Sequence, residues 1–424
     1  MFQVISSSWA LLLGMMLLMV GNGVQGTLLG IRGALEGFST FQMSLVMSGY
    51  FVGFLGGSRL APWMIRRVGH VRVFAALGSF VSAVLILYPV LTDPWLWMLL
   101  RVAIGFCFSG VYVTAESWLN NAASNENRGK ALSLYMVVQM VGIVASQGLV
   151  TLGDPSGFVL FVMPSVLVSI AFAPILLSVS PTPPFETAKS MSLKDLYRAS
   201  PLGFVGVFLL GAAFAALFGM AAVFGTEAGL SVGQISAFVS MIFIGGLVLQ
   251  FPIGWVSDRM DRRVLILLVA GVGALAALLP ILMSGQYSVL LLSAFLVGGL
   301  TNPLYALLIA HANDYLEPED MAAASSGLVF INGLGAVAGP VLTGWAMAAF
   351  GPNGFFAYVA IILILLVVYG AWRSTQRPSL DVDEQGTFVS LAPAASPVAV
   401  DMAQEIYIEA AQDEAEMGQN AQHS

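Results

Sequence analysis

The chain of 424 residues is 58% hydrophobic and only 9% charged, and it contains a single cysteine, Cys107. One cysteine excludes a disulfide-stabilised fold. The formal net charge is −7, but residues 378–424 hold nine acidic residues and no Lys or Arg, which leaves 16 basic and 14 acidic residues in the rest. The negative charge therefore belongs to a tail, and the charge pattern gives no support for nucleic-acid binding.

Twelve long apolar stretches follow one another along the chain, each able to cross a hydrocarbon core of about 30 Å as a helix. We expect spans at about 7–30, 41–63, 72–92, 95–118, 131–152, 157–179, 202–225, 232–256, 264–284, 287–311, 323–349 and 354–373. A membrane β-barrel would instead show short segments of alternating hydrophobicity. The pattern predicts an all-α membrane protein with twelve transmembrane helices.

The gaps between these stretches are alternately rich and poor in Lys and Arg. Two of the basic residues, Arg32 and Arg101, stand apart, and the other fourteen follow even-numbered spans. These fourteen are Arg59, Arg66, Arg67, Arg72, Arg128, Lys130, Lys189, Lys194, Arg198, Arg259, Arg262, Arg263, Arg373 and Arg377. Cytoplasmic loops collect Lys and Arg, so we expect a multi-pass protein of the inner (plasma) membrane with both termini in the cytoplasm.

The sequence contains an internal repeat. Residues 37–72 align with 229–264 at a constant offset of 192, and further matches occur near an offset of 193. The matched pairs include Gly37 with Gly229, Ser39 with Ser231, Gln42 with Gln234, Gly53 with Gly245, and Gly105 with Gly298. We predict two pseudo-symmetric six-helix bundles in parallel orientation; transporters built in this way bind their substrate near the bilayer midplane, between the halves.

Four segments follow from this organisation. We expect an N-terminal bundle at 1–180, a Pro-rich cytoplasmic linker at 181–201, and a C-terminal bundle at 202–377. The acidic tail, 378–424, has the composition of a mostly disordered cytoplasmic segment. A short amphipathic helix at 400–416 is the alternative for part of it.

Residues 254–263 (GWVSDRMDRR) form the most specific motif. It resembles the loop signature of the major facilitator superfamily, and the resemblance implies a cytoplasmic gate. The predicted gate residues are Gly254, Asp258, Arg259, Arg262 and Arg263, with Arg66 and Gly69 from the first half. A carboxylate here can accept hydrogen bonds from a neighbouring helix N-terminus and pair with arginines. Alternatively, the arginines only anchor the topology. In the first half, Arg66 stands where Asp258 does, so that copy must be built differently.

Further stretches are similar to a bacterial group of this superfamily, the YcaD-like transporters. They are 21–29 (GNGVQGTLL), 115–119 (AESWL), 127–130 (NRGK), 310–316 (AHANDYL), 323–327 (AASSG) and 335–340 (GAVAGP). The resemblance covers residues 7–373 and implies the twelve-helix fold and secondary transport.

Polar residues inside the apolar stretches are the candidate site, because ionisable groups in a membrane are costly and usually face the bundle interior or a cavity. The cavity candidates are Asn22, Gln25, Arg101, Gln139, Asn302 and Asn332. Arg101 and Gly105 also resemble the superfamily's fourth-helix arginine pattern, which implies a role in proton coupling; Arg101 would tune a partner carboxylate or hold an anionic substrate, or else cap a neighbouring helix. Glu116 is the second proton-coupling candidate, with a fixed anchor paired to Arg128 or Lys130 as the alternative.

The sequence contains no nucleotide-binding loop, metal-ligand cluster or nucleophile constellation, so we expect neither an enzyme nor a bound cofactor or metal. We predict a monomeric secondary transporter that moves a small solute by alternating access, coupled to protons. Export is slightly favoured over uptake, because the loop signature resembles efflux-type members. The alternatives are a non-transporting receptor or assembly factor that signals through its tail, and a lipid flippase.

Overall fold

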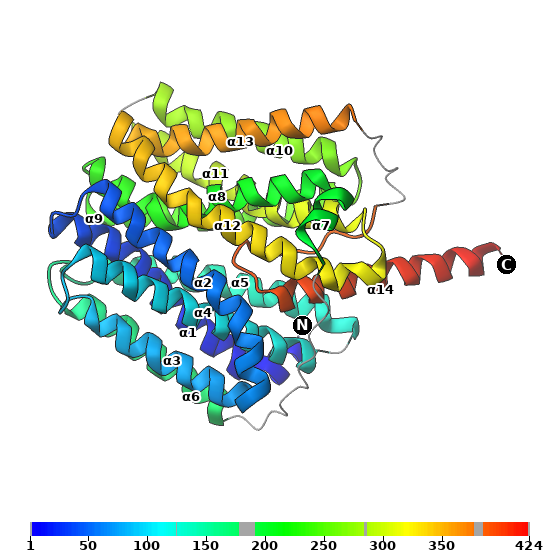
Figure 1. The fold of residues 1–424 in the computed structure, drawn as a ribbon, viewed down its shortest axis with the longest axis horizontal. Coiled ribbons are helices and arrows are strands. Elements are labelled where there is room, and N and C mark those ends of the chain that lie inside the picture. The colour runs from blue at the N-terminus through cyan, green and yellow to red at the C-terminus, as the bar shows by residue number, and fades with distance from the viewer. Residues whose placement is uncertain (1, 124, 178–190, 284–285, 377–384, 423–424) are drawn as a thin grey trace.

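The computed structural model describes residues 2–123, 125–177, 191–283, 286–376 and 385–422, and the regular structure in these residues is helical (Figure 1). The helices are α1 (Phe2–Leu35), α2 (Thr40–Val68), α3 (His70–Leu87), α4 (Pro94–Ala122), α5 (Asn125–Val150), α6 (Val159–Leu177), α7 (Leu193–Ala199), α8 (Pro201–Glu227), α9 (Val232–Ser257), α10 (Arg262–Leu282), α11 (Tyr287–Asn313), α12 (Pro318–Phe350), α13 (Asn353–Ser374) and α14 (Pro397–Gln422).

Ten of the helices in the described ranges are long and apolar enough to cross a membrane: α1, α3 to α5 and α8 to α13. The two other expected spans coincide with α2 and α6. Ser, Gly and Gln residues interrupt the apolar sequence of α2, and the apolar part of α6 is limited to Val159–Pro174. The chain is therefore an all-helical, multi-pass membrane protein, and the count of twelve spans stays a prediction.

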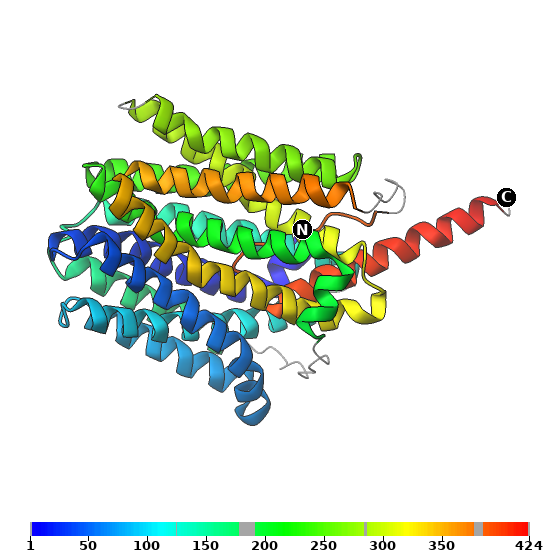
Figure 2. The ribbon, with the colours of Figure 1, turned by 45° about the horizontal axis from the view of Figure 1, so that its top comes forward.

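The long helices form two groups. Helices α1 to α6 pack on one another, and helices α8 to α13 do the same. In Figures 1 and 2 the first group runs from blue to cyan and the second from green to orange. Of the expected linker, residues 181–190 lie outside the described ranges, and α7 and the start of α8 occupy the remainder.

The sequence repeat is visible in the helix packing. Gly53 of α2 and Gly105 of α4 lie so close to the facing helix that its backbone occupies the place of a Cβ atom. Gly245 of α9 and Gly298 of α11, their sequence counterparts, are packed in the same way. Small residues allow such close approach of membrane helices, so the repeated glycines explain why α2 packs on α4 as α9 packs on α11.

The helix starts repeat as well. Ser39 begins α2 with a capping box in which its side chain accepts from the Gln42 N–H and the Gln42 side chain accepts from the Ser39 N–H. Ser231 and Gln234 form the same box at the start of α9. Capping boxes satisfy N–H groups that have no partner within the helix. Both halves thus enter their second long helix by the same local chemistry.

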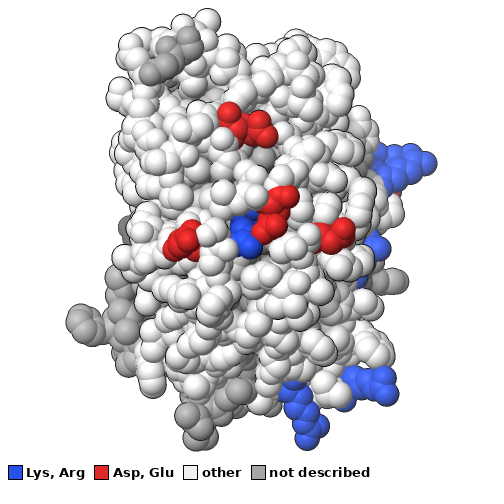
Figure 3. All heavy atoms as spheres, turned by 90° about the vertical axis from the view of Figure 1, so that its left-hand side faces the viewer, with Lys and Arg blue, Asp and Glu red and all other residues white. Residues whose placement is uncertain are grey.

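The two ends of the molecule differ in charge. Arg66, Arg67, Arg262 and Arg373 lie where α2 and α13 end and α10 begins; we name this the basic end, and the opposite one the far end. Figure 3 looks at the far end, where acidic groups surround one basic group at the centre of the face, and the other basic groups in view lie at the right and lower edges. Arg32 lies at this end and pairs with Glu36 at 2.6 Å, so it is fixed within the protein.

The two groups touch directly at the far end. The Thr40 hydroxyl of α2 donates to the Glu227 carboxylate that ends α8, at 2.6 Å. Gly30 of α1 packs against Ala222 of α8 so closely that a Cβ would lie 2.7 Å from the alanine side chain. The contact between α2 and α12 extends inward to Arg59, whose guanidinium lies 4.1 Å from the centre of the Phe330 ring.

The tail corrects the sequence-based expectation. Residues 378–384 lie outside the described ranges, but residues 385–396 and α14 are ordered rather than mostly disordered, and α14 is longer than the predicted 400–416. Composition misled because the apolar residues of the tail are concentrated in one stretch. Leu391, Ala395, Ala399, Val400, Met402 and Ala403 are all buried. They lie between the two helix groups, and the distal half of α14 then extends beyond the bundles (Figures 1 and 2).

Candidate functional site

A cavity of about 60 Å³ lies between the two helix groups. Its polar lining comes from four different helices: Asn22 of α1, Gln139 of α5, Asn302 of α11 and Asn332 of α12. These are four of the six predicted cavity residues. The space holds only a few water molecules. Ala392, Pro393 and Ala394, which precede α14, form part of the wall.

Three of the four amides already contact other polar groups. The Asn302 side chain donates to the Gln250 amide oxygen at 3.2 Å. The Asn332 side chain donates to the Pro393 carbonyl at 2.7 Å, and its own Oδ1 is buried without a hydrogen-bond partner among the described residues. Asn22 lies beside the Tyr50 hydroxyl. The cavity therefore offers amide groups of both halves to a solute, and their role in binding stays a prediction.

Aromatic rings from both helix groups also line the cavity. They are Tyr50, Phe51, Phe54, Tyr112, Phe214, Phe218 and Phe243. The Phe218 ring of α8 lies 5.8 Å from Tyr50, 6.2 Å from Phe51 and 6.4 Å from Phe243, measured between ring centres. This cluster joins the two helix groups, and none of its rings was among the predicted site residues. The spacing of Phe214 and Phe218 was a signal, but such spacing is typical of ordinary packing in apolar helices.

Arg101 is fully buried in α4, behind Tyr50 as seen from the cavity. Its guanidinium carbon lies 4.8 Å from the centre of the Tyr50 ring, and Nη2 lies 3.7 Å from the Met47 sulfur. Nε and Nη1 have no hydrogen-bond partner, and no carboxylate pairs with Arg101 in the described part of the chain. A partner carboxylate for Arg101 is thus not found there, nor is a bond to a helix end.

Gln25 is also placed away from the cavity wall. It is fully buried in α1 and lies beside the Tyr88 hydroxyl. Tyr50 and Tyr88 both face Arg101. Gln25 and Arg101 thus belong to a polar cluster behind the wall, one layer of side chains from the space that a solute would occupy.

Glu116 is buried near the basic end of α4. The Tyr135 hydroxyl donates to its Oε1 at 3.3 Å, and the Ser396 N–H donates to its Oε2 at 3.2 Å. The Ser396 hydroxyl also contacts Oε2. Of the two basic residues in the anchor alternative, Arg128 bridges Glu405 at 2.8 Å and Glu409 at 3.2 Å, both in α14. Among the described ion pairs, none joins Glu116 to Arg128 or Lys130.

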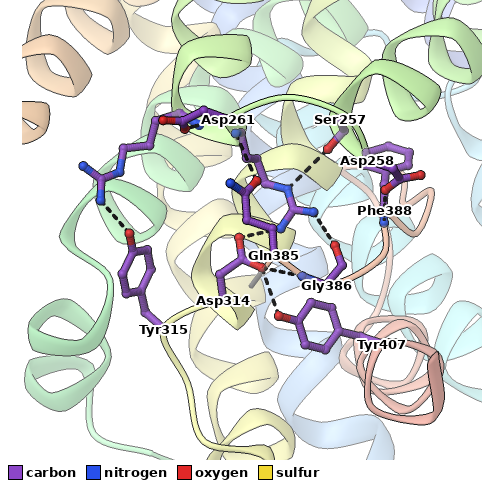
Figure 4. A network of polar contacts seen from close by, with 11 residues as sticks. Ser257, Asp258, Asp261, Asp314, Tyr315, Gln385, Gly386, Phe388 and Tyr407 are labelled. Atoms are coloured by element: carbon purple, nitrogen blue, oxygen red, sulfur yellow. Dashed lines mark hydrogen bonds and ion pairs between the residues drawn. The ribbon is translucent and has the colours of Figure 1, made fainter. Parts of the chain in front are cut away.

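The predicted gate motif surrounds Arg262, at the start of α10 (Figure 4). Arg262 forms an ion pair with Asp314 at the end of α11, and both side chains are buried. Its Nη2 donates to the Gly386 carbonyl at 2.5 Å, and Nε donates to the Ser257 hydroxyl at 3.3 Å. Burial raises the pKa of Asp314 although Arg262 and the Tyr407 hydroxyl beside it act in the opposite direction. The Arg262 guanidinium thus joins α9, α10, α11 and the tail, with each of its nitrogens on a different partner.

The motif led us to expect that Asp258 would pair with arginines, but none of the described ion pairs contains Asp258. Asp258 ends α9, and its Oδ1 accepts from the Phe388 N–H at 2.8 Å. The helix N-terminus is instead capped by Asp261, which accepts from the Arg263 N–H at 2.8 Å. The reason is geometric: Asp261 directly precedes α10, whereas Asp258 faces the tail, which was expected to be mostly disordered.

The other predicted gate residues have local roles. Arg263 donates to the Tyr315 hydroxyl at 2.5 Å, and the Arg259 guanidinium stacks 4.2 Å from the centre of the Trp255 ring. In the first half, Arg66 is exposed, and Gly69 makes the turn between α2 and α3 with a φ of 85° that favours glycine. Among the described residues, no cluster of three or more His, Cys, Asp or Glu side chains could hold a metal ion.

Comparisons with known proteins agree with this architecture. The sequence profile of the Major Facilitator Superfamily matches residues 11–240 and 203–401. The chain is 27% identical over 375 residues to the uncharacterized MFS-type transporter YcaD of Escherichia fergusonii, covering 87% of this chain and 96% of the relative. It is 26% identical over 373 residues to YcaD of Salmonella arizonae, with the same coverage of 87% and 96%.

Two solved structures share the fold. The nucleoside transporter NupG, as its D323A mutant, superposes with a TM-score of 0.75 at 15% identity, covering 86% of this chain and 99% of that one. An inward-facing bacterial homologue of the human lysosomal transporter Spinster gives a TM-score of 0.66 at 15% identity, covering 96% and 98%. Sequence profile, relatives and fold agree that this chain belongs to the Major Facilitator Superfamily and is similar to its YcaD-type transporters.

Proposed function

We propose that this chain is a twelve-span secondary transporter of the inner membrane that moves a small solute by alternating access, coupled to protons, with export slightly favoured over uptake. The observation that carries the proposal is the asymmetry between the two ends. At the far end the helix groups touch directly, through Thr40 and Glu227 and through Gly30 and Ala222. At the basic end the tail lies between the groups: it forms polar contacts with α4 and α5 on one side and with α11 on the other.

This arrangement corresponds to a transporter whose far end is closed and whose basic end is parted. Parallel-repeat transporters rock their two halves around a central site. The cavity lies where such a site belongs, with Asn22 and Gln139 from one group and Asn302 and Asn332 from the other. A solute held by both groups would be released when the groups separate.

The cavity wall favours a solute with a flat apolar body and a few hydrogen-bonding groups. Its rings offer apolar faces, and its amides can both donate and accept. The wall contains no charged residue among the described side chains. Arg101 lies one layer behind Tyr50, where its uncompensated charge would attract a partial negative charge on the solute.

Glu116 is the group that we propose to carry the proton. It is a buried carboxylate one helical turn from Tyr112, which lines the cavity. Its hydrogen bonds come from Tyr135 and Ser396, and no cation pairs with it in the described residues. A carboxylate in this setting can exchange a proton without breaking an ion pair.

The test starts with a thermal-shift screen of the purified protein, because a ligand that binds the folded state raises the melting temperature. Solutes that stabilise the protein are then followed in proteoliposomes under an imposed pH gradient. We expect gradient-driven flux in the wild type, loss of that flux with retained solute exchange in Glu116→Gln, and weaker binding in Asn22→Ala and Asn302→Ala. Gln376→Ala, an exposed amide, is the matched control. The absence of flux for every stabilising solute would refute the proposal.

A further inference from the structure

We propose that the parted basic end is a peptide-binding site, and that its ligand is the chain's own residues 385–411, here named the C-terminal segment, which act as a tethered plug that holds the transporter blocked. The inference rests on the proposed transport function for its consequence, but the site itself is defined by contacts. Figures 1 and 2 show α14 starting between the two helix groups and leaving the molecule at this end.

The first anchor is the start of α14. The buried Ser396 places its N–H and its hydroxyl on the Glu116 carboxylate. The same hydroxyl accepts from the Val398 N–H at 3.2 Å, so Ser396 also caps its own helix. A helix N-terminus carries a partial positive charge that favours an adjacent anion. Glu116 of the first helix group therefore acts as a capping carboxylate for the N-terminus of α14.

The second anchor is on the opposite helix group. The Gln404 side chain donates to the Asn313 amide oxygen at 3.0 Å, and the Tyr407 hydroxyl donates to Asp314 at 2.9 Å. Ser325 of α12 contacts Asp401. One turn after another of α14 thus faces α11 or α12 while its N-terminus is fixed on α4. The C-terminal segment bridges the two groups that must move for transport.

The third anchor is the extended stretch before α14, which binds the gate motif. The Gly386 carbonyl accepts from Arg262, and the Gly386 N–H donates to Asp314 at 3.3 Å. The Phe388 N–H donates to Asp258. Gly254 leaves the room for the Phe388 ring, because a Cβ at that glycine would lie 2.6 Å from the ring. The motif residues that we predicted to latch the gate are thus occupied by the C-terminal segment.

Charge and shape complete the fit. The acidic Glu405 and Glu409 face Arg128 at the start of α5. Ala392, Pro393 and Ala394 form part of the wall of the cavity between the helix groups, whose volume of about 60 Å³ is too small for a metabolite-sized solute. While the C-terminal segment is docked, a solute cannot occupy the cavity fully, and the basic end cannot close because the segment lies between the groups. Transport then requires the plug to leave.

The test measures docking and transport separately in the full-length chain. A cysteine is introduced by Ala403→Cys, at a site that is buried when the plug is docked, in a Cys107→Ala background. The rate of maleimide labelling reports release, and flux in proteoliposomes reports transport. Ser396→Asp places a second carboxylate against Glu116. Gln412→Asp adds the same charge at an exposed position of the same helix and is the matched control.

We expect Ser396→Asp to raise the labelling rate about tenfold, the effect of losing charge-assisted hydrogen bonds, and to raise flux, while Gln412→Asp leaves both unchanged. Tyr407→Phe removes the anchor on the other helix group and should raise labelling as well, which covers the possibility that one variant misfolds. Unchanged labelling in both Ser396→Asp and Tyr407→Phe would overturn the proposal. Faster labelling without flux in any variant would support docking of the C-terminal segment but refute the proposed transport function.

Discussion

Asp401 should make docking of the C-terminal segment weaken as the pH rises. Burial, together with the nearby Glu405 charge, raises the pKa of Asp401 from 3.8 to about 7, although Ser325 of α12 hydrogen-bonds to the carboxyl. Between these two values the docked state holds one proton more than the released state. The docking constant therefore falls by up to about tenfold for each pH unit inside this window, and about fiftyfold from pH 5 to pH 7, where the docked carboxyl is half deprotonated. Below and above this window Asp401 contributes no slope.

The assay is the labelling rate of the cysteine introduced by Ala403→Cys, measured from pH 5 to pH 8 and divided by the rate for the denatured protein to remove the titration of the thiol. Asp401→Asn should abolish the part of the slope that belongs to Asp401 and tighten docking at pH 7 and above. Asp195→Asn, which changes an exposed acid of α7, is the control. An equal slope in Asp401→Asn, or labelling that slows as the pH rises, would refute the reasoning.

Three further predictions concern the membrane body. Arg101→Ala should abolish flux without preventing insertion, while Arg198→Ala, at an exposed site, has no effect; wild-type flux in proteoliposomes with Arg101→Ala would contradict this. Asp314→Asn should lower the free energy of unfolding by about 3 kcal/mol, because it leaves the buried Arg262 without its carboxylate; an unchanged thermal-unfolding profile would disprove the role of the pair. Gly53→Ala and Gly245→Ala should each lower the free energy of unfolding by about 1–3 kcal/mol through overpacking. Gly271→Ala, with nothing within 4 Å of the added Cβ, should leave it unchanged. Equal melting temperatures for all three variants would argue against the repeated helix contacts.

Much of the fold could be predicted from the sequence because its signals are local. Ser39 with Gln42 and Ser231 with Gln234 cap helices within one turn, and this chemistry needs no distant partner. Gly53 and its counterpart Gly245 fall in the repeat and pack as membrane helices of small residues do.

The candidate site could be predicted only in part. Asn22, Gln139, Asn302 and Asn332 are polar residues in apolar helices, and they do line the cavity. The aromatic wall could not be distinguished from ordinary packing. Membrane depth alone could not show that Arg101 and Gln25 lie behind Tyr50 rather than in the cavity, because the side of a helix that faces the cavity depends on how it packs.

The structure of the tail could not be predicted from its composition. Its acidic residues indicated disorder, but the tail is held by contacts with Glu116, Arg128 and Arg262, which belong to helices distant in sequence. The prediction that Asp258 pairs with arginines failed for a similar reason. Its partner is the backbone N–H of Phe388, and every residue except proline has such a group, so the sequence gives no signal for it.

The order of the chain has a consequence for biogenesis. Ser396 and Tyr407, the tail residues that contact Glu116 and Asp314, follow both helix groups in the sequence, so a ribosome makes them after the last membrane helix. Proteins fold from the N-terminus onward during synthesis. The newly made transporter would therefore pass through a stage in which the plug is absent, and the plug could dock only after residues 385–411 have been synthesised.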